Sequence, residues 1–315
     1  MAHVHNFSYG LLNPGLAYLV SCLGCFLGLQ CTARARAHQG ASRARWLTLA
    51  ALSIGTAGIW VMHFIAMLGF TIPGQTISYN VFYTIASMLI SVIVVTIGLF
   101  IVGFGIGGLR PLLLGGTIIG IGVALMHYMG MFAMRMPDTM SYNPGLVVLS
   151  VVIAIVAGTA ALWAALRMRG RMLITLGASL VMGVAVSGMH YTGMAALHIF
   201  PAIDGGMAAM GSGVSGTTLL VPLILGISIL AFLVTIIVSL APSEAEVREE
   251  AELMDRISRL SKELGGHPQS LAATARVRCR AARLAGHDHA VPAVAGRAVA
   301  AGFAAACGGG AAAPR

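Results

Sequence analysis

Charged side chains are scarce over most of this sequence, and this scarcity excludes an ordinary soluble fold. Lys, Arg, Asp and Glu make up only 9% of the 315 residues, whereas a soluble domain carries roughly 25%. Hydrophobic residues account for 58% of the chain, and the mean hydropathy is +0.89. Only two acidic residues, Asp138 and Asp204, precede residue 243. We therefore expect the chain to fold in lipid.

Other absences exclude several classes of function. The single lysine, Lys262, follows the last apolar run, so a retinal Schiff base within a membrane span is excluded. No Ser/His/Asp set or pair of carboxylates can be assembled within the apolar runs, which predicts that the protein is not an enzyme. The net charge of +9 does not indicate nucleic acid binding, because the arginines gather at the edges of apolar runs and in the tail. The first 11 residues lack a basic segment and an A-x-A site, so no cleaved signal peptide is expected.

Seven apolar runs are long enough to cross a bilayer, which needs about 20 residues per helix. They predict an all-α, polytopic membrane domain over 12–241 with a short outer segment at 1–11. None contains Asp, Glu, Lys or Arg. The predicted spans are 12–31, 47–70, 81–103, 112–134, 146–166, 173–197 and 218–240.

The distribution of arginine predicts the orientation of these spans, because cytoplasmic loops carry an excess of basic residues. Alternate loops hold eight arginines on one side and only Arg135 on the other. The N-terminus is therefore expected outside the cell and the C-terminus in the cytoplasm. A chain rich in Arg, Ala and Gly with a single Lys is typical of a GC-rich bacterial genome, so the expected location is the inner membrane of a bacterium.

A His-centred motif recurs in every second span. The motif histidines are His63, His127 and His190, which are 64 and 63 residues apart, and each follows a methionine directly. The upstream stretches 114–131 and 176–194 also match each other. The first six spans therefore indicate three copies of a two-helix unit, and the seventh span is additional.

The three motif histidines should lie at one depth. Each is 15–17 residues from the inner end of its predicted span, a rise of roughly 22–26 Å. This depth falls in the outer third of a bilayer core of about 30 Å. A methionine four residues after each histidine (Met67, Met131 and Met194) offers a thioether on the same helix face.

Imidazole and thioether together indicate a transition-metal site. Thioether sulfur favours Cu(I), and imidazole suits copper, zinc or iron. The absence of carboxylates at this depth argues against Mg²⁺, Ca²⁺ and Mn²⁺. Three neutral histidines would leave a coordination position for water or a small gas molecule. Tyr128 and Tyr191 are candidates for anchoring at the interface or for bonding to the ligand.

The motifs and the seven-span plan resemble the MHYT-domain family of bacterial integral membrane sensors. Met189, His190, Tyr191 and Thr192 spell the motif itself, and the other two copies are close variants. The resemblance covers about residues 7–240. It implies a signalling protein that senses a diatomic gas (oxygen, carbon monoxide or nitric oxide), or the metal itself, through bound copper. The implied ligands are His63, His127, His190, Met62, Met67, Met126, Met131, Met189 and Met194.

Two other functions stay open at this stage. Two histidines from different helices are possible axial ligands in a haem-bearing redox protein. A copper transporter is less favoured, because the His and Met residues lie at one level and no intramembrane carboxylate forms a relay. His3, His5 and His198 are secondary candidates for a metal site. Cys22 and Cys25 form a C-x-x-C pair near mid-membrane, which we interpret as buried small side chains.

The residues after the last span predict an output through other molecules. Many members of the family carry cytoplasmic cyclic-di-GMP domains, and residues 242–315 leave no room for one, so an unknown cytoplasmic partner is expected. Residues 242–264 predict an amphipathic helix. Leu253, Ile257, Leu260 and Leu264 have coiled-coil spacing, which favours a homodimer through 243–264. Residues 265–315 are predicted to be disordered, with arginines that contact membrane lipid.

Overall fold

The computed structural model describes residues 10–72, 76–105, 108–136, 139–167, 172–200, 214–240 and 244–263. The chain divides into two compact units, Met1–Ala241 and Pro242–Arg315. The first unit holds the apolar helices and the short strands, and the described part of the second is an amphipathic helix.

Six helices in the described part of the chain are long and apolar enough to cross a membrane: Leu12–Ala37, Gly40–Leu68, Val81–Phe104, Leu109–Phe132, Pro144–Arg167 and Met172–Ala195. They are α1, the continuous segment α2 (Gly40–Leu52), η1 (Ser53–Val61) and α3 (Met62–Leu68), then α4, α5, α6 and α7. Six of the seven predicted spans are therefore present. Helix α8, Gly216–Leu240, coincides with the seventh, and its role as a membrane span stays a prediction.

The six spans pack in cyclic order as three helix pairs: α1 with α2–η1–α3, α4 with α5, and α6 with α7. The first helix of each pair contacts its own partner and also the second helix of another pair. Thus α4 packs on α5 and η1, α6 packs on α7 and α5, and α1 packs on η1 and α7. This order brings α3, α5 and α7, which carry the three motif histidines, into mutual contact.

The second span begins earlier than predicted and contains a π-helix. Its helix starts at Gly40 rather than at residue 47, and the Arg43 guanidinium lies over the Phe104 ring at 5.3 Å. The π-helical turns of η1 leave carbonyls that neighbouring helices satisfy. Ser21 Oγ donates to the Gly58 carbonyl at 2.7 Å, and Ser91 Oγ donates to the Gly55 carbonyl at 2.8 Å. Such wide turns in helices frequently occur at functional sites, and this one leads directly into Met62 and His63.

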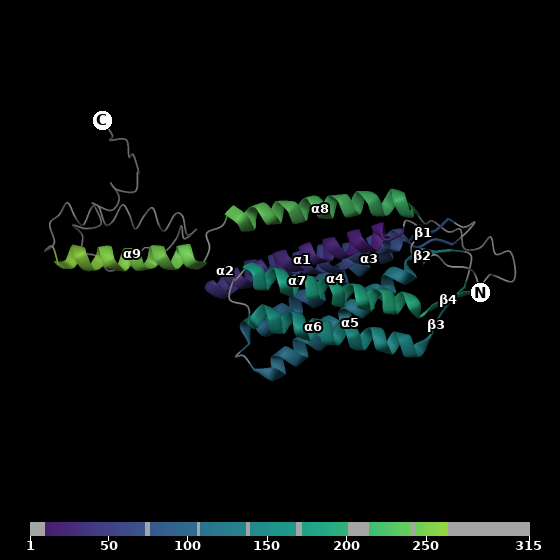
Figure 1. The fold of residues 1–315 in the computed structure, drawn as a ribbon, viewed down its shortest axis with the longest axis horizontal. Coiled ribbons are helices and arrows are strands. Elements are labelled where there is room, and N and C mark those ends of the chain that lie inside the picture. Colours follow the sequence, from purple (N-terminus) through teal and green to yellow (C-terminus); the bar gives the residue numbers. More distant parts are fainter. Residues whose placement is uncertain are drawn as a thin grey trace, which may run out of the picture. The chain divides into compact units, whose positions relative to one another are not determined.

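Short strands lie at one end of the first unit, whose described part is otherwise mostly helical, as the sequence predicts (Figure 1). A three-stranded sheet has the order β2 (Met134–Arg135), β1 (Ser78–Tyr79) and β5 (Val214–Ser215). Strands β3 (Thr139–Tyr142) and β4 (Leu197–Phe200) form an antiparallel pair. Strands of two to four residues are too short to show an alternating pattern in sequence, so the sequence does not predict them.

Two asparagines join these strands to the helices in the same way. The backbone N–H of Asn80 donates to the Ala133 carbonyl, and that of Asn143 donates to the Ala196 carbonyl, each at 2.8 Å. The Asn80 side chain also accepts from the Tyr83 N–H at the start of α4, and the Asn143 side chain accepts from the Gly145 N–H. Both residues therefore begin a helix and form a backbone hydrogen bond to the end of another helix. These two bonds hold the helices together at the strand-bearing end of the bundle.

The described arginines of the first unit are unevenly divided between its two ends. Those at the ends of α1, α2, α5 and α6 lie at the end opposite to the strands, whereas Arg135 lies on β2. This sorting agrees with the expected orientation, which stays a prediction because it refers to a membrane. The arginines at positions 169 and 171 fall outside the described residues.

The second unit contains helix α9, Glu244–Glu263. Leu253 and Leu260 are exposed, at 59% and 56%, and Ile257 is half-buried. The predicted apolar stripe is therefore open along this helix. Leu264 and the predicted tail lie outside the described residues.

Candidate metal centre

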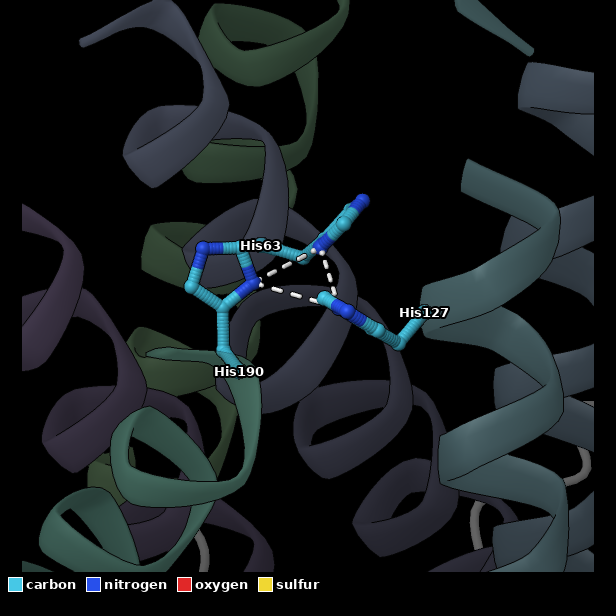
Figure 2. A group of neighbouring side chains, drawn as sticks. All are labelled: His63, His127 and His190. Atoms are coloured by element: carbon cyan, nitrogen blue, oxygen red, sulfur yellow. Dashed lines mark hydrogen bonds between the residues drawn. The ribbon is translucent and has the colours of Figure 1, made fainter. Parts of the chain in front are cut away.

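The imidazoles of His63, His127 and His190, hereafter the histidine triad, converge on a common point (Figure 2). Each turns its Nδ1 atom toward the other two. The Nδ1–Nδ1 distances are 3.0 Å between His63 and His190, 3.2 Å between His127 and His63, and 3.3 Å between His190 and His127. The three nitrogens thus form a nearly equilateral triangle, with one corner from each helix pair.

Hydrogen bonds alone cannot satisfy this triangle. In a neutral imidazole each ring nitrogen is either a donor or an acceptor. Among three mutually adjacent nitrogens, at most two of the three pairs can therefore join a donor to an acceptor. At least one pair must set two protons or two lone pairs against each other. A cation at the centre would accept all three lone pairs at once, which removes this conflict.

The size of the triangle fits a transition-metal ion. Metal–nitrogen bonds to histidine are about 2.0–2.1 Å, and two ligands of a tetrahedral ion at this bond length lie about 3.3 Å apart. The observed separations of 3.0–3.3 Å are close to that value. An ion bound by all three Nδ1 atoms would leave one tetrahedral position for a further ligand.

The triad is buried at a single level of the bundle. His63, His127 and His190 are 1%, 0% and 1% exposed. Each stands five residues before the last residue of its helix, which is Leu68, Phe132 or Ala195. This offset is a rise of about 7.5 Å. The common depth expected from the sequence is therefore present in the structure, at the strand-bearing end.

Two glycines make room for the outer edges of the rings. A Cβ atom on Gly130 would overlap His63 Nε2, and a Cβ atom on Gly193 would overlap His127 Nε2. Each glycine stands three residues after the motif histidine of its own helix. The space beside it, hereafter the glycine seat, holds the histidine ring of another helix pair. The Nε2 atoms of His63 and His127 are buried without a hydrogen-bond partner. The rings are thus held by packing, which fixes where Nδ1 points.

An aromatic layer covers the triad toward the strands. The ring that follows each histidine (Phe64, Tyr128 or Tyr191) lies against it, with centroids 4.7–5.0 Å apart. The Tyr128 hydroxyl forms a hydrogen bond with Ser150 Oγ at 2.7 Å, so this hydroxyl has a protein partner.

Two further tyrosines, outside the spans, continue this layer. Tyr79 packs on Phe64, and Tyr142 packs on Tyr128. Burial raises the pKa of the Tyr79 hydroxyl above its usual range. Burial and then the nearby Tyr128 raise the pKa of Tyr142. Both phenols therefore stay neutral at physiological pH, which keeps negative charge away from this part of the bundle.

The other predicted site residues are placed differently. The six motif methionines are buried in the apolar core, five in the main cluster and Met62 in a smaller one beside Ala17 and Ala66. Their role as ligands stays a prediction. His198 lies on β4, opposite Ser141 in the strand pair. Cys22 and Cys25 are buried free thiols, as interpreted from the sequence. His3 and His5 lie outside the described residues.

Comparison with known proteins connects this chain to bacterial signalling. The MHYT family profile, described as a bacterial signalling protein N-terminal repeat, matches residues 57–116 and again residues 120–178. The bifunctional diguanylate cyclase/cyclic di-GMP phosphodiesterase MucR of Pseudomonas aeruginosa is 35% identical over 261 residues, covering 82% of this chain and 37% of the relative. The cyclic di-GMP phosphodiesterase NbdA of the same organism is 39% identical over 199 residues, covering 62% and 25%.

A third relative extends the comparison to another group of bacteria. Signaling protein YkoW of Bacillus subtilis is 31% identical over 187 residues, which cover 58% of this chain and 23% of the relative. The chain thus spans between 23% and 37% of the length of these three proteins. No solved structure matches the chain.

Proposed function

Because the chain belongs to the MHYT-domain family of bacterial membrane signalling proteins, we propose that its histidine triad binds one metal ion. Copper is the ion that we favour. The bundle then acts as a sensor of a diatomic gas (oxygen, carbon monoxide or nitric oxide) or of the metal itself. The observation that carries this proposal is the triangle of Nδ1 atoms, 3.0–3.3 Å apart, whose contacts cannot all be hydrogen bonds.

The surroundings of the triad favour copper as Cu(I). The cost of moving an ion out of water rises with the square of its charge, so a monovalent ion is much cheaper to bury than a divalent one. The candidate group contains only neutral imidazoles, and no carboxylate of the group compensates a second positive charge. Cu(I) is also the ion that the neighbouring thioethers of the motif methionines suit best.

A small gas fits this centre as the sensed ligand. A metal held by three protein nitrogens keeps a position where a small molecule can bind, and this is the chemistry that the metal would supply. The protein supplies the rest: the Gly130 and Gly193 seats hold the rings, and the aromatic layer excludes bulk water. A change at the triad would act on three helices that contact one another, which gives the signal a route into the bundle.

The geometry argues against the two alternative functions. A haem iron takes its axial ligands on opposite faces of a large flat ring, and nitrogens within 3.3 Å of one another leave no space for that ring. A transporter needs a series of sites across the membrane. In the part of the chain that the structure describes, the histidine triad is the one group of His, Cys, Asp and Glu side chains that could hold a metal.

The test is the metal content of the purified full chain. We expect wild-type protein, loaded with Cu(I) under reducing conditions in nanodiscs, to retain about one copper per chain, with nitrogen ligands in its X-ray absorption spectrum. His198→Ala, which removes a histidine outside the triad, is the matched control and should retain the same amount. A wild type that retains no copper in either oxidation state, and no other transition metal, would refute the proposal.

We also propose that α9 passes the signal on by pairing with a second copy of this chain. Its exposed leucines, Leu253 and Leu260, are spaced by seven residues with Ile257 between them, which is the spacing of a coiled-coil seam. The cyclic di-GMP activities in the names of two relatives belong to those whole proteins. For the bundle of this chain we propose a sensor without enzymatic activity of its own, which acts on a cytoplasmic partner.

Leu260→Glu should weaken this pairing, because it sets like charges against each other in the apolar seam. We expect the fraction of dimer to fall at least several-fold. Mass photometry, together with a cross-linking reagent that does not react with cysteine, measures this fraction. Glu252→Gln, which alters an exposed residue of the same helix, is the control and should leave the dimer intact. If the wild type is monomeric at membrane concentrations, α9 does not pair with itself.

A further inference from the structure

A dry cavity lies in the middle of the bundle, directly beneath the histidine triad. It has a volume of about 50 Å³, and all six spanning helices contribute to its wall. Three of the lining residues, Ile59, Val123 and Val186, stand four residues before His63, His127 and His190. The cavity therefore reaches to within one helical turn, about 6 Å, of the level of the triad.

The wall of this cavity is apolar throughout. All the lining residues are Ile, Val, Leu, Ala, Gly, Met or Cys, so no side-chain nitrogen or oxygen faces the space. A buried water needs two to four polar partners, whereas a cavity lined by aliphatic side chains stays dry and takes up apolar molecules such as xenon. This cavity is thus unsuited to water, ions and polar metabolites.

Size limits the occupant further. One water molecule needs a cavity volume of roughly 10–15 Å³, and this cavity has a volume of about 50 Å³. This is enough for a molecule of two or three heavy atoms, or one xenon atom, but too little for a lipid chain or an aromatic ring. The size and the dryness together define a site for small apolar molecules.

The structure also indicates how such a molecule enters. Ala157 and Ala161 of α6 and Ala185 of α7 line the cavity and are only half-buried. The wall between these two helices therefore consists of small methyl groups next to the lipid-facing surface. Apolar gases concentrate in the hydrocarbon of a membrane, so this side faces their reservoir.

We propose that the cavity is a binding site for an apolar molecule of two or three atoms, which enters from the bilayer between α6 and α7. At its other end, Met189 lines the cavity and directly precedes His190. The occupant is thus held one turn from the candidate metal centre. Only this last step, delivery to the triad, rests on the proposed function; occupancy of the cavity does not require a metal.

Xenon is the probe that tests the site. Crystals of the full chain, freed of metal and pressurised with xenon, should show an anomalous peak bounded by Ala157, Val186 and Met189. Ala157→Leu fills the cavity from α6 and should abolish the peak, and Ala185→Leu should do the same from α7. Ala160→Leu makes the same change at an exposed position of α6 and should leave the peak unchanged.

The outcomes separate this inference from the proposed function. No xenon in the wild-type cavity, or an unchanged peak in both Ala157→Leu and Ala185→Leu, overturns the inference. Copper content measured on the same variants is expected to equal that of the wild type. A protein that binds xenon in the cavity but retains no metal would support this inference while refuting the metal site.

Discussion

Alanine at any one of the three triad positions is expected to abolish metal retention. His63→Ala, His127→Ala and His190→Ala each remove one of three Nδ1 ligands from a site with no other described His, Cys, Asp or Glu ligand within reach. Changes to groups that merely support a metal-bound histidine already cost about 10–100-fold in affinity. Loss of a direct ligand should cost more, so that copper falls from about one per chain to near zero after purification.

Stability measurements separate a metal ligand from a packing residue. Metal at 100 times its Kd stabilises a protein by about 2.7 kcal/mol through binding to the folded state. We expect wild type to gain this increment in thermal unfolding and the three alanine variants to gain none. In the metal-free state each alanine variant is also expected to lose stability, because it leaves a cavity beside buried rings. Three variants that retain copper and gain the same stabilisation from it as wild type would show that the histidines only pack.

Gly193→Ala is expected to lower metal affinity about 10–100-fold, the range seen when support of a ligand histidine is lost. Its Cβ would overlap Nε2 of the buried His127 ring, so the ring must turn and carry its Nδ1 away from the triangle. Gly130→Ala should act in the same way on His63. Competition with a Cu(I) chelator of known affinity measures the effect.

Gly188→Ala is the matched control for this experiment. It lies on the same helix, five residues before Gly193, and a Cβ there meets nothing within 4 Å. Both substitutions gain about 1 kcal/mol of helix propensity, so the difference between them isolates the contact with the ring. Equal metal affinities in Gly188→Ala and Gly193→Ala would mean that the glycine seat does not position the histidine.

Much of the membrane domain could be predicted from the sequence, because lipid imposes simple rules on helix length and charge. Ten of the twelve ends of six spans were located to within about three residues. The first span ends at Ala37 instead of residue 31, and the second begins at Gly40 instead of residue 47. The two arginines in that stretch suggested a loop. They extend the helix instead, because Arg43 stacks on Phe104 at the bundle surface.

The site was harder to foresee than the fold. The spacing of the motifs predicted that His63, His127 and His190 share a level, but not which ring nitrogen faces inward. That choice depends on side-chain rotamers and on the glycine seats across the helix contacts. The repeated glycine three residues after His127 and His190 was the signal available in the sequence. The π-helix and the cavity arise from packing among all the helices, which no local pattern encodes.

The cyclic packing of the helix pairs makes the three corners of the triangle similar but not identical. Phe64, Tyr128 and Tyr191 follow the histidines, and Ala66 stands where the other two helices have Gly130 and Gly193. The three helix pairs therefore pack alike, but different residues surround the space between their histidines. A small ligand bound there would contact each pair differently, and it would shift one helix pair more than the other two. A bundle of three similar helix pairs can therefore pass a binding event on along one pair in preference to the others.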